Sequence, residues 1–433
     1  MNVHKHPAQQ DWSNLLKRPV MEAVELEARV LAILKEVQER GDAALIDFAL
    51  KFDGAAPKSL LATDAEIAEA NTLVSAELKA AIQVAKTNIE KFHSAQKEAE
   101  IRVETMPGVN CWRKSLPIEK VGLYIPGGTA PLFSTILMLG VPATIAGCKQ
   151  LVLCTPPNKE GKIHPAILYT ANLLGIKTIV KAGGAQGIAA MAFGTASVPK
   201  VFKIFGPGNQ YVTTAKQLVT KYGVAIDMPA GPSEVAVVAD KNANATFVAA
   251  DLLSQAEHGA DSQVVLVSDS EELINRVQAE VTAQLAKLSR KDFAAKALDN
   301  SKAFLVKDMN QAMEMINLYA PEHLILQVDD LDALVAQVVN AGSVFIGPYT
   351  PESAGDYASG TNHTLPTNGY ATAYAGVSLD SFIRKVTFQK ITKEGLQAIG
   401  PVIEVMAAAE MLDAHKNAVT VRLNAIDSNR NSK

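Results

Sequence analysis

Two side chains that can bind a metal ion lie close together in the segment SQAEHG. Gln255 and His258 are three residues apart, so on a helix they share one face, and Gly259 directly after them predicts the helix end. The pair alone is weak evidence, because the glutamine can hydrogen-bond locally and the histidine can simply favour the helix dipole. A metal site therefore requires further ligands that converge on this pair.

Such ligands occur later in the chain. The segment PESAGDYASGTNH is rich in small residues and contains Asp356 and His363, which suits a loop that brings a carboxylate close to a ligand, although an ordinary surface turn has the same composition. His415 follows in DAHKN. Gln, His, Asp and a further His are oxygen and nitrogen donors that could fill a zinc shell, with glutamine an unusual member. They spread over roughly 160 residues, so only the fold can bring them together.

A possible acid–base pair precedes the apolar run LILQV. Glu322 and His323 follow Pro321, which places them at the mouth of an expected strand. A histidine exchanges protons near neutral pH, and a neighbouring carboxylate can orient it or activate water. A solvated Glu–His pair in a loop remains an equally good interpretation.

Three glycine-rich turns are candidate nucleotide sites, namely YIPGGTAP, KAGGAQGIAA and FGPGNQ. The last two open expected helices, whose N-terminal amides can hold an anion. The nearest approach to a dinucleotide fingerprint, Ala182–Gly184–Gly187, lacks the first glycine, and no Asp or Glu follows before Asp227. The residues alone are compatible with a nicotinamide-dependent enzyme or a metal-dependent hydrolase. A non-catalytic metal-binding protein is a third interpretation.

Composition excludes several classes of protein. The 433 residues are 48% hydrophobic, which excludes disorder and is enough for two to four domains, and the net charge of -4 argues against nucleic-acid binding. The odd number of cysteines, Cys111, Cys148 and Cys154, indicates a reducing compartment, and we interpret all three as structural. Because MNVHKHPAQQDW also lacks signal-peptide architecture, we expect a cytoplasmic protein.

One uncharged stretch, 121–148, is long enough to cross a bilayer if it were a single helix. Pro126, Pro131 and Pro142, with the pair Gly127 and Gly128, instead predict a short strand, a turn and an apolar helix. We therefore expect a buried layer and no membrane span.

The elements that must position these residues follow an α/β pattern. Helical periodicity dominates the first hundred residues and returns after about residue 376. Between them, short apolar runs alternate with helical segments, with a break near 225–234, which predicts two Rossmann-like lobes with parallel sheets plus small N-terminal and C-terminal helical segments.

The assembled strings resemble one family. VGLYIPGGTAPLFST, GGAQGIAA, KIFGPGNQYVT, DMPAGPSEV, DLLSQAEHG, PEHL, PESAGDYASGTNH and AAAEMLDAHKNAV are similar, in this order and through nearly the whole chain, to L-histidinol dehydrogenase. The resemblance implies NAD-dependent oxidation of L-histidinol through L-histidinal to L-histidine, with two NAD reduced, as the last step of histidine biosynthesis. It also implies an aldehyde-dehydrogenase-like arrangement of the lobes.

Residue by residue, the resemblance implies four groups of functional positions. Zinc ligands would be Gln255, His258, Asp356 and His415, and the acid–base pair would be Glu322 and His323. Substrate would contact Ser233, His363 and Glu410 besides the zinc ligands and His323, and NAD would contact Tyr124, Gln186 and Asn209 in an atypical mode that needs no ribose-binding acid.

The resemblance further implies a homodimer in which the C-terminal segment, with Glu410 and His415, completes the partner's site. The expected division is a helical region at 1–120 that contributes to the second lobe, an NAD-binding lobe at 121–231, a second lobe with metal and catalytic residues at 232–375, and a helical dimerisation segment at 376–433. No nucleic acid or membrane partner is expected.

Overall fold

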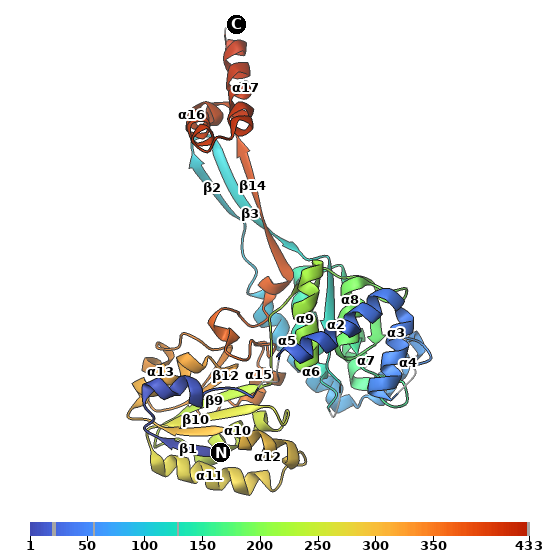
Figure 1. Ribbon diagram of the computed structural model, residues 1–433, viewed down its shortest axis with the longest axis vertical. Coiled ribbons are helices and arrows are strands. Elements are labelled where there is room, and N and C mark those ends of the chain that lie inside the picture. The colour runs from blue at the N-terminus through green and yellow to red at the C-terminus, as the bar shows by residue number, and fades with distance from the viewer. Residues whose placement is uncertain (20–22, 55–56, 128–129, 431–433) are drawn as a thin grey trace. The chain divides into compact units, whose positions relative to one another are not determined.

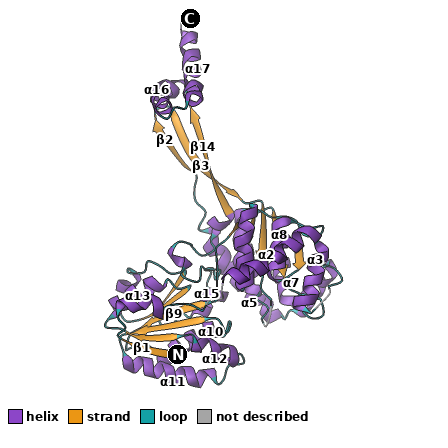
Figure 2. Ribbon diagram, viewed as in Figure 1, coloured by secondary structure: helices purple, strands orange, loops and turns teal. Residues whose placement is uncertain are grey.

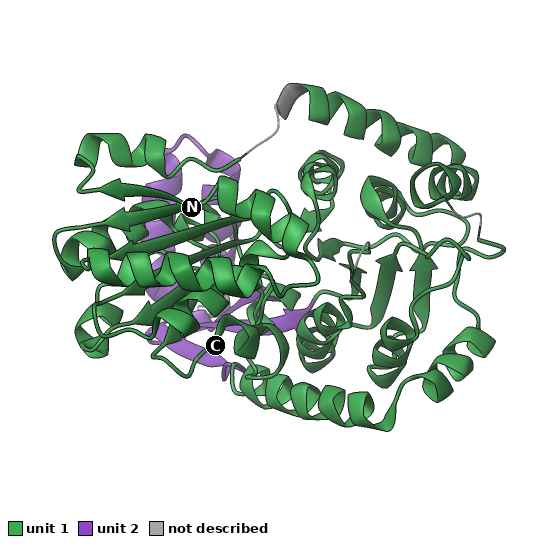
Figure 3. Ribbon diagram, turned by 90° about the horizontal axis from the view of Figure 1, so that it is seen from below, with its two compact units in different colours: residues 1–96, 118–382 green, residues 97–117, 383–433 purple. Residues whose placement is uncertain are grey.

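The computed structural model describes residues 1–19, 23–54, 57–127 and 130–430, and it divides them into two compact units (Figure 3). Unit 1 comprises Met1–Gln96 and Ile118–Phe382, and unit 2 comprises Lys97–Pro117 and Ile383–Lys433, of which 431–433 are not described. Unit 1 contains two parallel sheets, which confirms the α/β class expected from the sequence (Figure 1).

The first sheet of unit 1 has five parallel strands in the order β6-β5-β4-β7-β8. Its strands are β4 (Lys120–Tyr124), β5 (Gln150–Thr155), β6 (Thr178–Lys181), β7 (Lys203–Phe205) and β8 (Ala225–Ile226). Strands β4 to β7 are the short apolar runs of the sequence, and their continuous burial is typical of a sheet covered on both faces.

The second sheet of unit 1 has six parallel strands in the order β1-β11-β10-β9-β12-β13. Its strands are β1 (Asn2–Lys5), β9 (Glu234–Ala239), β10 (Gln263–Ser268), β11 (Lys302–Leu305), β12 (His323–Gln327) and β13 (Ser343–Ile346). In both sheets the strand order reverses beside the first strand of the lobe, as in doubly wound folds.

Helices lie along both sheets (Figure 2). Those of unit 1 are α1 (Trp12–Leu15), α2 (Ala23–Arg40), α3 (Asp42–Phe48), α4 (Asp64–Leu73), α5 (Ala76–Ser94), α6 (Phe133–Ala146), α7 (Pro165–Leu173), α8 (Gly184–Phe193), α9 (Gln210–Val219), α10 (Ala245–Ala256), α11 (Glu271–Leu285), α12 (Lys291–Asp299), α13 (Met309–Tyr319), α14 (Leu331–Val335) and α15 (Glu352–Tyr357). Shorter turns are η1 (Gln9–Asp11), η2 (Ala49–Asp53), η3 (Thr220–Tyr222), η4 (Tyr370–Thr372) and η5 (Leu379–Phe382).

Side chains begin several helices where the sequence has cap residues. Asn209, Asn244 and Ser270 each accept a hydrogen bond from the first turn of α9, α10 and α11. Such caps satisfy amides that have no partner inside the helix, so they fix where each helix starts after its strand.

Unit 2 is built from two chain segments. Strands β2 (Ile101–Met106), β3 (Val109–Pro117) and β14 (Ile383–Ile391) form an antiparallel sheet in the order β14-β3-β2. The helices α16 (Lys393–Ala409) and α17 (Asp413–Arg430) pack against each other. The sequence predicts only helix in these two segments. Periodicity missed the strands because their long-range pairing, and the exposure of most of their side chains, leave no apolar stripe.

The N-terminal helices also depart from expectation. Strand β1 joins the second sheet, but α2 packs on α8 and α9, α4 on α7, and α5 on α6, all in the layers of the first sheet. The apolar face of α2, including Val30, Leu34 and Val37, lies in the same core as α8. Most of the region 1–120 in unit 1 therefore covers the first sheet. The domain boundaries at 120, 231 and 375 remain predictions.

The uncharged stretch contains the strand β4 and the helix α6, as expected, although Pro142 lies inside α6 without ending it. Gly128, part of the predicted turn, lies outside the described residues. No helix in the described part of the chain has the length and apolar character needed to cross a membrane.

Candidate functional site

The candidate acid–base pair lies at the amino edge of the second sheet. Strand β12 starts at His323 and pairs with the start of β9, so Glu322, His323 and Glu234 are neighbours, and the predicted strand mouth is confirmed. Doubly wound sheets usually bind ligands at the carboxyl edge. Here α10 runs back from the carboxyl end of β9, so its last turn, with Gln255, meets the strands where they begin.

Hydrogen bonds hold Glu322 and His323 in fixed orientations. Glu322 Oε2 accepts from the backbone N–H of Glu234 at 2.8 Å and from Gln255 Nε2 at 3.2 Å. His323 Nδ1 lies 3.2 Å from the carbonyl oxygen of Glu234, to which it donates, and 3.6 Å from Glu322 Oε2. Both side chains are buried, so water does not compete for these bonds. A pair held in this way is positioned, unlike a solvated loop pair.

Three carboxylates surround the His323 ring. Glu322, Glu352 and Asp356 lie within 4.0 Å of its nitrogens. Burial alone would lower the pKa of His323, but these acidic groups, Glu322 foremost, outweigh it and raise the pKa well above its ordinary value. The Nε2 atom is buried without a hydrogen-bond partner and lies 3.5 Å from Asp356 Oδ1. The acidic groups therefore favour the imidazolium form of this ring, whereas a cation bound to Asp356 would favour the neutral form, whose Nε2 can accept a proton.

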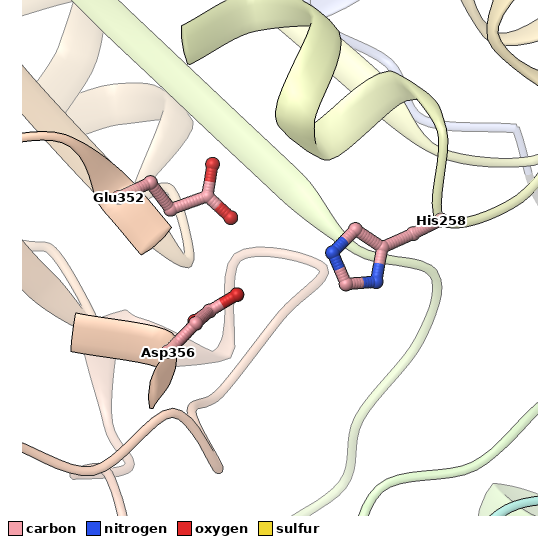
Figure 4. A group of neighbouring side chains, drawn as sticks. All are labelled: His258, Glu352 and Asp356. Carbon is pink, nitrogen blue, oxygen red and sulfur yellow. The ribbon is translucent and has the colours of Figure 1, made fainter. Parts of the chain in front are cut away.

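A group of possible metal ligands lies beside this ring. His258, Glu352 and Asp356 offer ligand atoms that all lie within 4.8 Å of one another, and Figure 4 shows the two carboxyl groups and the His258 imidazole facing a common space. The sequence predicts that His258 shares a helical face with Gln255. Helix α10 ends at Ala256, so His258 instead lies just beyond the helix end. A turn bond from the His258 N–H to the Gln255 carbonyl, 3.2 Å long, keeps the two residues close.

Two orphaned oxygens indicate that these residues fit a cation. Gln255 Nε2 donates to Glu234 and Glu322, which leaves Gln255 Oε1 buried without a partner. Asp356 Oδ1 is likewise buried without a hydrogen bond. A buried acceptor that lacks a donor is costly. Burial would raise the pKa of Asp356, but His323, His363 and His258 lower it below its ordinary value, so this carboxylate is ionised and suited to a cation.

Glu352 is a site residue that the sequence analysis missed. It lies one helical turn before Asp356 in α15, is 1% exposed, and accepts a hydrogen bond from Ser254 at 3.0 Å. Burial raises the pKa of Glu352 to about 8. The i,i+4 spacing of the two acids in PESAGD was the available signal, but a helix there was not expected.

Both ring nitrogens of His363 form hydrogen bonds within the protein. Its Nδ1 lies 2.8 Å from the carbonyl of Asp356 and its Nε2 lies 3.1 Å from Thr135 Oγ1 on α6. Burial lowers the pKa of His363, so the neutral ring donates from Nδ1 and accepts at Nε2. Both ring nitrogens are therefore used in positioning Asp356. Ser233, just before β9, forms no side-chain hydrogen bond with the described residues.

Glu410 and His415 belong to unit 2. Glu410 is the C-terminal cap of α16 and His415 lies in the first turn of α17, and both are exposed. Around them, large apolar side chains are also exposed, namely Val402, Val405, Met406, Met411 and Leu412. The structure thus brings together Gln255, His258, Asp356, Glu322 and His323 within unit 1, whereas Glu410 and His415 lie beside exposed apolar side chains of unit 2.

The three predicted cofactor contacts lie at the carboxyl edge of the first sheet. Tyr124 ends β4, and its hydroxyl accepts from the N–H of Gly184 at 2.8 Å. Gln186 lies in the first turn of α8, is 3% exposed, and forms no side-chain hydrogen bond with the described residues. Asn209 caps α9. A carboxamide beside two helix N-termini is a suitable set of polar groups for binding a nucleotide.

Comparisons with known proteins agree with these features. The family model described as Histidinol dehydrogenase matches residues 16–423. Histidinol dehydrogenase from Bacteroides thetaiotaomicron is 62% identical over 426 residues, covering 98% of this chain and 100% of that protein. The Pectobacterium atrosepticum enzyme is 52% identical over 420 residues, covering 96% of this chain and 94% of that protein.

A solved structure of histidinol dehydrogenase from Elizabethkingia anophelis matches with a TM-score of 0.96 and 56% identity, covering 99% of each chain. An acetylating aldehyde dehydrogenase from Geobacillus thermoglucosidasius, at 15% identity and a TM-score of 0.47 over 88% of this chain and 94% of that chain, is too distant to support any assignment. The resemblance found in the sequence is confirmed: the chain belongs to the histidinol dehydrogenase family of NAD-dependent oxidoreductases.

Proposed function

We propose that this protein is a zinc-dependent histidinol dehydrogenase that oxidises L-histidinol through L-histidinal to L-histidine and reduces two NAD, as the last step of histidine biosynthesis. The observation that carries the proposal is the convergence of Gln255, His258 and Asp356 beside Glu322 and His323 at one edge of the second sheet. The family membership supports the substrate.

The metal would be held by Gln255, His258, Asp356 and His415. The orphaned Gln255 Oε1, the ionised Asp356 and the neighbouring His258 support the first three. When bound, zinc supplies a fixed point for the amine and imidazole of histidinol, and NAD supplies the hydride acceptor.

The chain's own residues would move the protons. In each oxidation the substrate loses a hydride and a proton. His323 Nε2, the ring nitrogen without a hydrogen-bond partner, would accept the proton from the alcohol. Glu322 Oε2 is tied to Glu234 and Gln255, so Oε1 is the oxygen left to activate water for hydration of the aldehyde. Ser233 and His323 would contact the substrate directly, and retention of the aldehyde would prevent loss of a reactive intermediate.

Cofactor binding would use Tyr124, Gln186 and Asn209. The carboxamide of Gln186 and the helix N-termini of α8 and α9 support a nucleotide at this edge. Because both oxygens of Asp227 are engaged in protein contacts, it is no substitute for the missing ribose-binding acid.

We also propose a cytoplasmic homodimer in which Glu410 and His415 complete the partner's site, with Glu410 contacting substrate. The exposed apolar side chains near these residues, of which Met411 is 86% exposed, support a surface that another chain covers. His363, which the resemblance assigns to substrate contact, would also hold Asp356 in place through the carbonyl of that residue.

The decisive experiment is an NADH assay of the zinc-loaded protein with L-histidinol. We expect two NADH for each L-histidine formed, with no free aldehyde trapped by an added hydrazide. A matched reaction with L-histidinal should give one NADH. Failure to reduce NAD with either compound would contradict the proposal and favour a zinc-dependent hydrolase built on the same ligands.

A further inference from the structure

A buried ion pair lies beneath the glycine-rich turn FGPGNQ, which precedes α9. Lys216, on α9, pairs with Asp227, which directly follows β8, and the two side chains are 2% and 0% exposed. Charged side chains are rarely buried to this extent, because removing both from water costs more than their attraction usually returns. A buried ion pair is therefore weak evidence for a stabilising role. The groups that contact the pair indicate a different role.

The pair holds both backbone polar groups of one residue, Gly206. Lys216 Nζ donates to the carbonyl oxygen of Gly206 at 2.8 Å, and the N–H of Gly206 donates to Asp227 Oδ2 at 2.8 Å. Asp227 Oδ1 also accepts from the N–H of Met228 at 2.7 Å. Because these charge-assisted bonds are all buried, Gly206 has little freedom to shift.

Gly206 is also pressed against β4. Its φ is +129°, a conformation that favours glycine, and a Cβ atom built there would lie 2.1 Å from the carbonyl oxygen of Tyr124. Three residues further on, Asn209 Oδ1 accepts from the N–H of Val212 at 3.1 Å and so begins α9, the helix that also carries Lys216. The clamped glycine therefore sits between two residues proposed to contact the dinucleotide.

We propose that Lys216 and Asp227 are positioning residues for the dinucleotide, because they clamp Gly206 and so set the turn 206–209 relative to Tyr124. The inference rests on the proposed NAD-dependent function. It assigns Asp227, the only acid near this turn in the sequence pattern, to holding the backbone rather than a ribose hydroxyl.

The test compares three variants with the wild type. Lys216→Met/Asp227→Asn removes both charges and keeps an acceptor for Gly206, Asp227→Asn removes one charge with the same shape, and Lys216→Arg keeps the charge and donors. The matched control is Lys149→Met/Glu119→Gln, which removes an exposed pair at the opposite end of the same sheet.

Dissociation constants for NAD are measured by calorimetric titration, together with both KM values, kcat, zinc content and thermal unfolding. We expect the double variant to bind NAD at least ten-fold more weakly, with kcat at saturating NAD and the KM for histidinol within two-fold of wild type. Lys216→Arg should recover part of the affinity, and the surface control should be unchanged.

A folded double variant with unchanged NAD affinity would overturn the inference, as would an equal rise in both KM values. If the double variant does not fold, the NAD affinity and the two KM values of the isosteric variant Asp227→Asn provide the same test. Titration of the wild type separates the two hypotheses. NAD binding without histidinol oxidation would contradict the proposed function but still allow the clamp to be tested, whereas absence of NAD binding would overturn both.

Discussion

His323 Nε2 faces Asp356 Oδ1 at 3.5 Å, while the Nδ1 atom of the same ring donates to the backbone of Glu234 at 3.2 Å. One ring nitrogen is thus fixed by the sheet, and the other is directed towards the candidate ligands. Because the backbone bond sets the tautomer, Nε2 is the nitrogen that can take a proton from a substrate. In the proposed mechanism, His323 would therefore act beside the metal ligands without being one of them.

Replacement of His323 by Asn should separate proton transfer from metal binding. The amide cannot accept the proton, so we expect kcat to fall by roughly 10²–10⁴-fold. Zinc content should stay near wild type, because the proposed ligands are other side chains. The matched variant His258→Ala should instead lose zinc. Turnover close to wild type in His323→Asn would count against the role of His323 as the base.

Glu352 should behave as a neutral group. Because burial raises its pKa to about 8, the side chain is mainly protonated at pH 7, and Gln is a close substitute that still accepts from Ser254. We expect Glu352→Gln to keep its zinc and most of its turnover. Loss of zinc from this variant, measured by metal analysis after dialysis, would show instead that Glu352 is a ligand.

The hydrogen bond from Thr135 to His363 should act on the site through Asp356. Thr135→Val removes the only donor to His363 Nε2 among the described residues. A neutral hydrogen bond contributes about 1 kcal/mol, so we expect kcat/KM for histidinol to fall about five-fold. Thr135→Ser keeps the hydroxyl and should recover the rate. If both variants match the wild type, this bond does not position the site.

The site residues of the second sheet could be predicted from the sequence more completely than the helices and strands around them. Gln255, His258, Asp356 and the Glu322–His323 pair were found because each has a distinctive side chain next to a glycine, a proline or an apolar run. Their convergence depends on α10 returning to the start of β12, which residue spacing alone does not show. The resemblance to a family supplied that information.

Other features were outside the reach of periodicity. Glu352 was missed because one turn of helix, Glu352–Tyr357, is too short to give a pattern. Strand β14 was missed because its partner, β3, lies about 270 residues earlier in the chain. Local sequence cannot reveal a pairing of that separation, nor that Thr135 would meet His363.

Mixing two inactive variants should test whether sites are shared between chains. Asp356→Ala lacks a ligand proposed for one chain, and His415→Ala lacks the ligand proposed for its partner. If each site combines residues of both chains, heterodimers formed after mild dissociation contain one intact site, and about a quarter of wild-type activity should return because half of the dimers are mixed. Each variant alone serves as the control. No activity in a mixture shown to contain heterodimers would contradict shared sites.

Asp251 gives a prediction about stability and pH. It lies in α10, is 6% exposed, and accepts a hydrogen bond from Gln327 Nε2 at 2.8 Å. Burial raises the pKa of Asp251 from 3.8 to about 6. The folded chain therefore binds more protons than the unfolded chain between these pH values, so this group lowers the free energy of unfolding as pH rises through that window, and the loss persists above it.

Asp251→Asn should remove this loss, because the amide carries no charge and can still accept from Gln327. Its Nδ2 also offers a donor to Gln327 Oε1, which is buried without a partner. We expect the variant to be more stable than wild type by about 1–3 kcal/mol at pH 8 and indistinguishable near pH 4, measured by denaturant unfolding. The exposed Asp299→Asn should show no such pH-dependent difference. A gain of the same size at both pH values would mean that hydrogen bonding, rather than the buried charge, limits stability at this position.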